Sequence, residues 1–393
     1  MTRSGFFMHL GLGALGSGLT HKQVLAFLSS PTSSPVFFYI GCYTQSADEG
    51  IAECRFEEQK GTIQLSGVCK SIDNPSFLIF GNRRKWVYAV NETADFGDKK
   101  SGGVSSFLCD QKTGKLTFLN SQASLGAHPC HLTMDRQGKF ILVANYSGGN
   151  VAVLPILANG ELGEAVDIVQ HTGKSINANR QEGPHAHSVN LSHDNRFAFV
   201  CDLGIDKIMI YRFNQKTGKL SPSGSQYFQT APGAGPRHFT FSNDGRNAFV
   251  VNELNSTITS FRYNQSSGEL TEIQTLSTLP DGFTEENTCA DIHVHPNGSF
   301  VYASNRGHNS IAVFQCQAGF EKLKLVQNQS TLGQTPRNFA IHPSGRYLLA
   351  ANQNSNSVHV FSIDPSTGLL SETGNPGNPG NHYTINKPVC ILF

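Results

Sequence analysis

Four charged side chains in the second half of the chain have the types that anion chemistry needs. Arg237 and Glu253 stand near the two ends of the segment GPRHFTFSNDGRNAFVVNEL, whose alternating apolar residues predict a two-stranded hairpin. Because they are equidistant from its turn, we expect their side chains to form an ion pair. Arg306 and Arg337 follow in corresponding segments. An excess of arginine over carboxylate predicts a site for a carboxylate or a phosphate. The alternative is a salt bridge that only stabilises the hairpin end.

Histidine supplies a group for proton transfer. His185 and His187 occur in the motif GPHAHS, where alternate residues of an extended segment share one face. Such a pair could bind a metal, but no acidic cluster accompanies it, so we predict no metal and no other cofactor. His187 corresponds in the repeat described below to Arg237, and imidazole accepts a proton near neutral pH. We predict four catalytic residues: His187, Arg237, Glu253 and Arg306.

Four further residues are predicted to bind the substrate: His185, Arg337, His238 and Asp291. His238 and Asp291 share one position of the repeat, directly after the position that holds Arg237. His293 and His295, in DIHVHP, are predicted instead as strand and turn residues.

The elements that must position these side chains are the strands of an internal repeat. Each copy has a leading strand, a turn such as HPNG, HPSG or SNDG, a second strand that ends in Asn or Asp, and a third strand. A fourth strand follows KTGKL, SSGEL or STGLL in several copies. The copies begin 47 to 57 residues apart, at Pro75, Pro129, Ala186, Pro236, Cys289, Pro336 and Pro388. Four short strands per copy are typical of a β-propeller blade.

The two ends of the chain complete the last blade. The segment VFFYIGCYT (36–44) matches the second strand of a blade, and KPVCILF (387–393) matches a first strand. Pairing them removes an exposed sheet edge. The sequence therefore predicts an all-β fold, a seven-bladed β-propeller over residues 36–393, closed by the C-terminal strand in the N-terminal blade.

Comparison of the copies separates structural positions from candidates for chemistry. The Asn or Asp that ends each second strand is expected to bond nearby backbone. The next position varies, holding Tyr43, Glu92, Tyr146, Leu203, Glu253, Arg306 and Gln353. A purely structural ring should be uniform, so this variation marks a site in the central channel. The predicted catalytic residues and Arg337 lie on four consecutive blades.

Composition excludes several classes of function. The formal net charge is +1 over 393 residues, so there is no electrostatic reason to expect nucleic acid as a partner. The body of the chain has no apolar stretch of about 18 residues, so no membrane span is predicted there. The nine cysteines include no C-x-x-C pair and are predicted to be reduced.

Residues 1–35 differ from the rest and are predicted to be a separate leader. One Arg precedes the Gly-rich run MHLGLGALGSGL, and a polar stretch ends in SSPTSSP, as in a secretion signal. Residues 2–7 approach a twin-arginine motif but carry Ser4 in place of its second Arg. We expect export, for example to the periplasm; the alternative is a disordered leader on a cytoplasmic protein.

The chain resembles a known family in a set of motifs that extends from about residue 36 to the C-terminus. They are PHAHSV (184–189), DLGIDKI (202–208), GPRHFTF (235–241), NEL (252–254), YASNRGHNSIAVF (302–314) and QTPRNFAIHPSGRYLLAAN (334–352). The chain is similar to the seven-bladed propeller lactonases, which include bacterial 6-phosphogluconolactonase of the propeller type and fungal carboxy-cis,cis-muconate lactonizing enzyme. The resemblance implies a site of one His, two Arg and one Glu. By motif these correspond to His187, Arg237, Glu253 and Arg306, with Arg337 competing for the last place.

The resemblance covers both lactone hydrolysis and cycloisomerisation, and we expect hydrolysis of a small sugar or anionic lactone. A base must activate water, and positive groups must stabilise the oxyanion. Arg237 and Arg306 suit the second role. Glu253 and His187 are both candidates for the base, and His187 is favoured because an adjacent Arg lowers the pKa of a carboxyl group.

Three alternatives remain. A cycloisomerase of the muconate type would use the same arginines to hold carboxylates, and a non-catalytic propeller would bind without chemistry. A calcium-dependent lactonase would need converging carboxylates, for which Asp202, Asp291 and Glu253 are available.

Overall fold

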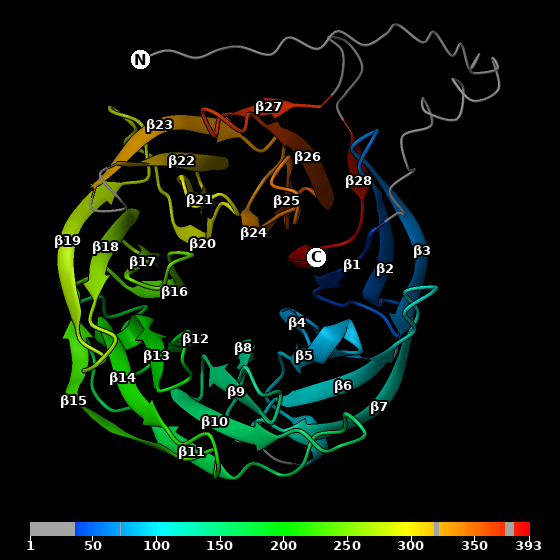
Figure 1. Cartoon of the computed structure of the whole chain (residues 1–393), viewed down its shortest axis with the longest axis vertical. Coiled ribbons are helices and arrows are strands. Elements are labelled where there is room, and N and C mark those ends of the chain that lie inside the picture. Colours follow the sequence, from blue (N-terminus) through cyan, green and yellow to red (C-terminus); the bar gives the residue numbers. More distant parts are fainter. Residues whose placement is uncertain (1–35, 71, 99, 318–321, 374–380) are drawn as a thin grey trace, which may run out of the picture. The chain divides into compact units, whose positions relative to one another are not determined.

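Seven antiparallel sheets surround one axis in the part of the chain that the structure describes. This computed structural model describes residues 36–70, 72–98, 100–317, 322–373 and 381–393. The predicted leader, residues 1–35, lies outside the described residues. The first strand of each sheet lies nearest the axis and the last lies at the rim (Figure 1). The predicted all-β, seven-bladed propeller is confirmed.

The first four blades follow the chain from its N-terminal side. Blade 1 contains β29 (Pro388–Leu392), β1 (Val36–Cys42), β2 (Gly50–Glu57) and β3 (Thr62–Lys70). Blade 2 contains β4 (Leu78–Phe80), β5 (Trp86–Asn91), β6 (Gly103–Cys109) and β7 (Leu116–Ala123). Blade 3 contains β8 (Pro129–Met134), β9 (Phe140–Asn145), β10 (Asn150–Pro155) and β11 (Asp167–Gln170). Blade 4 contains β12 (Ala186–Leu191), β13 (Phe197–Asp202), β14 (Lys207–Phe213) and β15 (Leu220–Gln229).

The remaining three blades repeat the same order. Blade 5 contains β16 (Pro236–Phe241), β17 (Asn247–Asn252), β18 (Thr257–Tyr263) and β19 (Leu270–Ser277). Blade 6 contains β20 (Cys289–Val294), β21 (Phe300–Asn305), β22 (Ser310–Gln317) and β23 (Lys322–Ser330). Blade 7 contains β24 (Pro336–Ile341), β25 (Tyr347–Asn352), β26 (Ser357–Ile363) and β27 (Leu370–Glu372), with β28 (His382–Thr384) also paired to β26. Single-turn helices are η1 (Asn82–Arg84), η2 (Phe96–Asp98) and η3 (Leu203–Ile205).

The hydrophobic core is divided among the interfaces between neighbouring blades. Phe199 of blade 4 stacks on Phe239 of blade 5, with ring centroids 5.2 Å apart and planes 4° from parallel. Each buried Phe side chain stabilises the fold by about 1.5–3 kcal/mol. Buried clusters of this kind join each blade to the next around the whole ring. The ring therefore distributes its core over many equivalent contacts and keeps the innermost strands in place.

The C-terminal strand closes the ring as predicted. In β29, Ile391 pairs with Ile40 and Cys390 with Gly41 of β1. Phe38 of the same blade packs with Leu349 of blade 7 in a cluster that also contains Ile391. Closure pairs the N-terminal blade on its inner side, so that β1 has no free edge there.

All nine cysteines are free in the structure, and seven of them are buried. Within the described residues, no candidate membrane-spanning helix is found.

Candidate active site

A β-bulge at the start of the innermost strand brings successive side chains toward the axis. In blade 5 the register of β16 against β17 shifts between Pro236 and His238, which makes Arg237 an extra residue in the strand. The side chains of Arg237 and His238 then lie together, with Arg237 Nη1 3.3 Å from His238 Nε2. The corresponding shifts in blades 4 and 7 give His187 and Arg337 equivalent places.

Glu253 is bound by three guanidinium groups. Arg237 donates from Nε to Glu253 Oε2 at 2.9 Å, which confirms the ion pair expected from the hairpin. Arg306 Nη2 lies 2.9 Å from the same oxygen, and Arg180 Nη2 lies 2.5 Å from Oε1. The side chains of Arg237 and Glu253 are only 2% and 3% exposed. These four residues form what we call the Glu253 cluster, in which one carboxylate faces three positive charges.

The arginines keep Glu253 ionised. Burial alone would raise its pKa, but Arg306, Arg237 and Arg180 together lower the pKa of Glu253 to about 2. Burial and the neighbouring arginines Arg306 and Arg337 lower the pKa of Arg237 to about 10, so it stays protonated at neutral pH. Glu253 is therefore a poor proton acceptor at neutral pH and is suited to orienting the arginines around it.

His187 is suited to accept a proton. Its ring is buried and meets the edges of Tyr146 and His238, with centroids 5.4 Å apart in each case. Burial, followed by the charge of Arg237, holds the pKa of His187 well below its usual range, so the imidazole is neutral at pH 7. Nδ1 lies 3.7 Å from Cys130 Sγ, whereas Nε2 has no hydrogen-bond partner among the other described residues.

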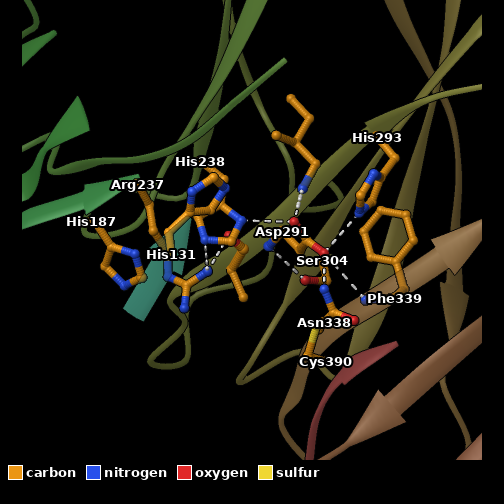
Figure 2. Close-up of polar contacts among 12 residues, drawn as sticks. His131, His187, Arg237, His238, Asp291, His293, Ser304, Asn338, Phe339 and Cys390 are labelled. Carbon is orange, nitrogen blue, oxygen red and sulfur yellow. Dashed lines mark hydrogen bonds and ion pairs between the residues drawn. The ribbon is translucent and has the colours of Figure 1, made fainter. Parts of the chain in front are cut away.

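Figure 2 shows a second buried carboxylate, Asp291, close to His238 and Arg237. Asp291 Oδ1 is 2.8 Å from His238 Nδ1, and Oδ2 is 2.9 Å from His293 Nε2 and 2.5 Å from Asn338 Nδ2. We call these four residues the Asp291 network. Since Arg237 donates to Nε2 of His238, Nδ1 of that ring carries the proton and donates to Asp291. Burial and then Arg237 lower the pKa of His238 to about 4, so it remains neutral. The Asp291 network thus fixes the ring that contacts Arg237.

Arg337 lies apart from Glu253. Its guanidinium group stands over the ring of Tyr43, 5.4 Å from the centroid. The hydroxyl of Tyr43 donates to both carboxylate oxygens of Glu92, at 3.0 and 2.9 Å. No described residue accepts a hydrogen bond from Arg337. Arg337 therefore keeps its donors available for a ligand.

A small cavity joins Arg337 to the Glu253 cluster. Its volume is about 10 Å³, room for about one water molecule. The hydroxyl of Ser76 is buried without a partner among the described residues. The lining residues are Ser76, Phe77, Glu92, Cys130, Arg237, His238, Arg337, Asn338 and Val389.

The side chain of His185 contacts Tyr146. The two rings are stacked, with centroids 4.5 Å apart, and His185 Nε2 lies 3.1 Å from Glu182 Oε1. Both histidines of the GPHAHS motif therefore contact Tyr146, His185 by stacking and His187 by its edge.

The structure brings His187, Arg237, Glu253 and Arg306 together around one end of the innermost strands, and places His238 and Asp291 beside them. Sequence reasoning missed Arg180, which lies in a segment outside the repeat. Glu92 and Tyr146 occupy the same variable ring position as Glu253, and that shared position was the signal that could have found them.

The carboxylates considered for a calcium site face different donors. Asp202 Oδ2 lies 2.6 Å from His171 Nδ1, whereas Glu253 binds arginines and Asp291 binds His238. Among the residues described, no group of three or more His, Cys, Asp or Glu side chains has a geometry that could hold a metal ion.

Comparison with known proteins agrees across sequence and structure. The family model described as "Lactonase, 7-bladed beta-propeller" matches residues 37–393. A 6-phosphogluconolactonase of Bacillus subtilis is 37% identical over 355 residues, covering 90% of this chain and 97% of the relative. A 6-phosphogluconolactonase of Formosa agariphila is 33% identical, covering 77% of this chain and 85% of the relative. The structure of a periplasmic gluconolactonase of Pseudomonas aeruginosa superposes with a TM-score of 0.84 at 32% identity, covering 91% of this chain and 98% of that one.

Proposed function

The chain belongs to the family of seven-bladed β-propeller lactonases, and from this premise we propose that it hydrolyses an anionic sugar δ-lactone at the Glu253 cluster. The observation that carries the proposal is the group of three arginines on one buried carboxylate, beside a neutral histidine. The names of the relatives support 6-phosphoglucono-δ-lactone and glucono-δ-lactone as the substrates to test.

In the proposed reaction His187 is the general base. Its Nε2 takes a proton from water as the water oxygen bonds to the lactone carbonyl carbon. The carbonyl oxygen becomes negative, and the remaining N–H groups of Arg237 and Arg306 stabilise that charge. The bond from the carbonyl carbon to the ring oxygen then breaks, and the ring oxygen takes the proton back from His187. The product is the open hydroxy acid.

The other residues support this step in the proposal. Glu253 holds Arg237 and Arg306 in position, because Oε2 accepts a hydrogen bond from Arg237 and forms an ion pair with Arg306. His238 and Asp291 fix the guanidinium plane of Arg237 from the other side. Arg337, His185 and Arg180 are proposed to contact the part of the substrate remote from the carbonyl. Catalysis by preorganised charges of this kind needs little movement during the reaction.

The decisive experiment is hydrolysis by Arg237→Ala, followed as acid release from both lactones. Loss of a donor aimed at the oxyanion lowers kcat by about 10²- to 10³-fold. Arg246→Ala is the matched control, since Arg246 is an exposed arginine at the turn of the same hairpin. Normal activity of folded Arg237→Ala would overturn the site. Muconate absorbance, measured in parallel, identifies a cycloisomerase if it changes while neither sugar lactone is consumed.

We also propose that residues 1–35 are an export leader preceding the propeller at 36–393. Cell fractionation with N-terminal sequencing of the recovered protein tests this: export predicts a mature N-terminus close to residue 35. A cytoplasmic protein that keeps its first residues would contradict it. Location also bears on the substrate, because a phosphorylated lactone is met chiefly inside the cell.

A further inference from the structure

Arg180 reaches the Glu253 cluster from outside the repeated blades. It belongs to the segment 171–185, which connects β11 of blade 3 to β12 of blade 4. Its Nη2 contacts Glu253 Oε1 at 2.5 Å and the hydroxyl oxygen of Tyr146 at 3.3 Å. The side chain is 37% exposed, against 2% for Arg237 and 12% for Arg306. Arg180 is therefore the guanidinium of this cluster that solvent and ligands reach first.

The segment that carries Arg180 is anchored by hydrogen bonds to Asp206. This carboxylate is fully buried and accepts from Ser175 Oγ at 2.5 Å, Gln181 Nε2 at 2.7 Å and the backbone N–H of Gly235 at 2.7 Å. Gln181 is the residue next to Arg180, and Gly235 lies two residues before the arginine that begins the bulge of β16. One buried carboxylate thus ties the segment that carries Arg180 to the strand that carries the deeper arginine.

The charges of the cluster leave Arg180 available. Glu253 Oε2 is shared by Arg237 and Arg306, and Oε1 is taken by Arg180. Three guanidinium groups on one carboxylate leave an excess of two positive charges, which favours an anion. If Arg180 turns away, Glu253 keeps two buried arginine partners. A guanidinium group pairs with phosphate or carboxylate through two parallel hydrogen bonds.

We propose that Arg180 is a specificity-determining residue, which binds the anionic substituent of the substrate at the position remote from the lactone carbonyl. To bind this substituent, the Arg180 side chain breaks its ion pair with Glu253. The substituent is a phosphate or a carboxylate, two groups that a guanidinium recognises in the same way. The inference rests on the proposed lactonase function. Relatives named for a phosphorylated and for an unphosphorylated gluconolactone leave this choice of substituent open.

The test compares Arg180→Gln with wild type in the full chain by calorimetry. Three stable acids differ only at the sixth carbon: gluconate with a hydroxyl, glucarate with a carboxylate and 6-phosphogluconate with a phosphate. Arg180→Gln should weaken binding of an acid that carries the recognised anion by about 10- to 100-fold relative to gluconate. The acid that loses more identifies the substituent. Arg180→Lys keeps the charge but not the paired geometry, so its affinity for that acid should lie between those of wild type and Arg180→Gln.

A kinetic comparison of the two lactones tests the role of Arg180 during the reaction. For Arg180→Gln the KM for 6-phosphoglucono-δ-lactone, divided by that for glucono-δ-lactone, should rise by about 10- to 100-fold if phosphate is recognised. Arg212→Gln is the control, because Arg212 is exposed on β14 at the end away from the site and its loss removes the same charge. It should leave both KM values unchanged.

The outcomes separate this inference from the proposed function. A wild-type protein that hydrolyses neither lactone overturns the lactonase mechanism. In that case the calorimetry still tests whether Arg180 binds the anionic substituent. Equal weakening of all three acids by Arg180→Gln, or a change below about threefold for each, overturns the specificity role. The first of those results means that Arg180 only supports the site structurally.

Discussion

Glu253 and Asp291 are two buried carboxylates in neighbouring blades, and they differ in the side chains that bind them. Glu253 is surrounded by arginines, each a long side chain with N–H groups to spare beyond those that bind the carboxylate. Asp291 is surrounded by shorter side chains, His238, His293 and Asn338, together with backbone N–H groups. The first arrangement accumulates positive charge and keeps donors for a ligand; the second consumes its donors internally.

This difference separates a site from its support. A buried ion pair contributes little net stability, because desolvation offsets the attraction between the charges. An excess of charge at the Glu253 cluster is therefore better explained by a ligand than by folding. The Asp291 network carries no such excess and touches Arg237 only through His238. We interpret it as the part that positions the arginine.

The first prediction tests the comparison on two buried histidines. His187→Gln should lower kcat by about 10²- to 10⁴-fold, because a general base contributes that much. His131→Gln is the matched control: His131 is also buried with a lowered pKa, but its ring packs at a tilt against Phe77 and its Nδ1 accepts from the N–H of Val189. It should cost less than about tenfold in kcat. Similar losses in both variants would remove His187 from the proposed mechanism.

The second prediction exchanges the two carboxylates for amides. Glu253→Gln should lower kcat/KM by about 10²-fold, because the arginines lose the charge that orients them. Asp291→Asn should instead cost about 3 kcal/mol of unfolding free energy, since it breaks a buried hydrogen-bonded charge. Its kcat/KM at 25 °C should fall by less than about tenfold. Lactone kinetics and denaturant unfolding of both variants measure the two effects. The reverse pattern would make Asp291 the functional carboxylate.

The third prediction concerns the pH at which His187 and His293 are protonated, and it involves the smallest expected change in activity. Burial and the arginines lower the pKa of His187, whereas Asp291, against the opposing effect of burial, raises the pKa of His293. As pH falls, His293 should therefore gain its proton above the usual histidine range and His187 well below it. Histidine NMR titration, assigned with His187→Gln and His293→Gln, checks the order.

Protonation of His187 should also determine how activity depends on pH. If the neutral form of His187 is the base, kcat/KM should stay constant through pH 6.5 and decline only at lower pH. Arg337→Gln removes a positive charge that lowers the pKa of His187, so it should move this decline to higher pH. An activity that falls together with protonation of His293 would link the reaction to the Asp291 network instead.

Much of the fold was predictable because its signals are local. Alternating apolar residues and glycine turns specify strands and hairpins, and their repetition specifies the number of blades. The pairing of β29 with β1 followed from two half-motifs at opposite ends of the chain. The ion pair of Arg237 with Glu253 was equally accessible, since both residues belong to one hairpin.

The choice between Arg306 and Arg337 needed the folded ring. Both follow Glu253 in later blades, and sequence spacing did not decide between them. In the structure Arg306 binds Glu253, whereas Arg337 turns to Tyr43 of the first blade. That contact exists only because the ring closes, which brings blade 7 beside blade 1.

By itself the sequence determined seven blades, their closure, and a hairpin that pairs an arginine with a glutamate, because each of these depends on neighbours along the chain. Tertiary structure alone decided that Arg180 reaches Glu253, 73 residues away, and that Arg237 and His238 both point toward the axis. The contact of Arg180 depends on the non-repeating segment 171–185, which the carboxylate of Asp206 anchors. The second depends on a bulge, which shifts the alternation of a strand by one residue and leaves no periodic mark in the sequence.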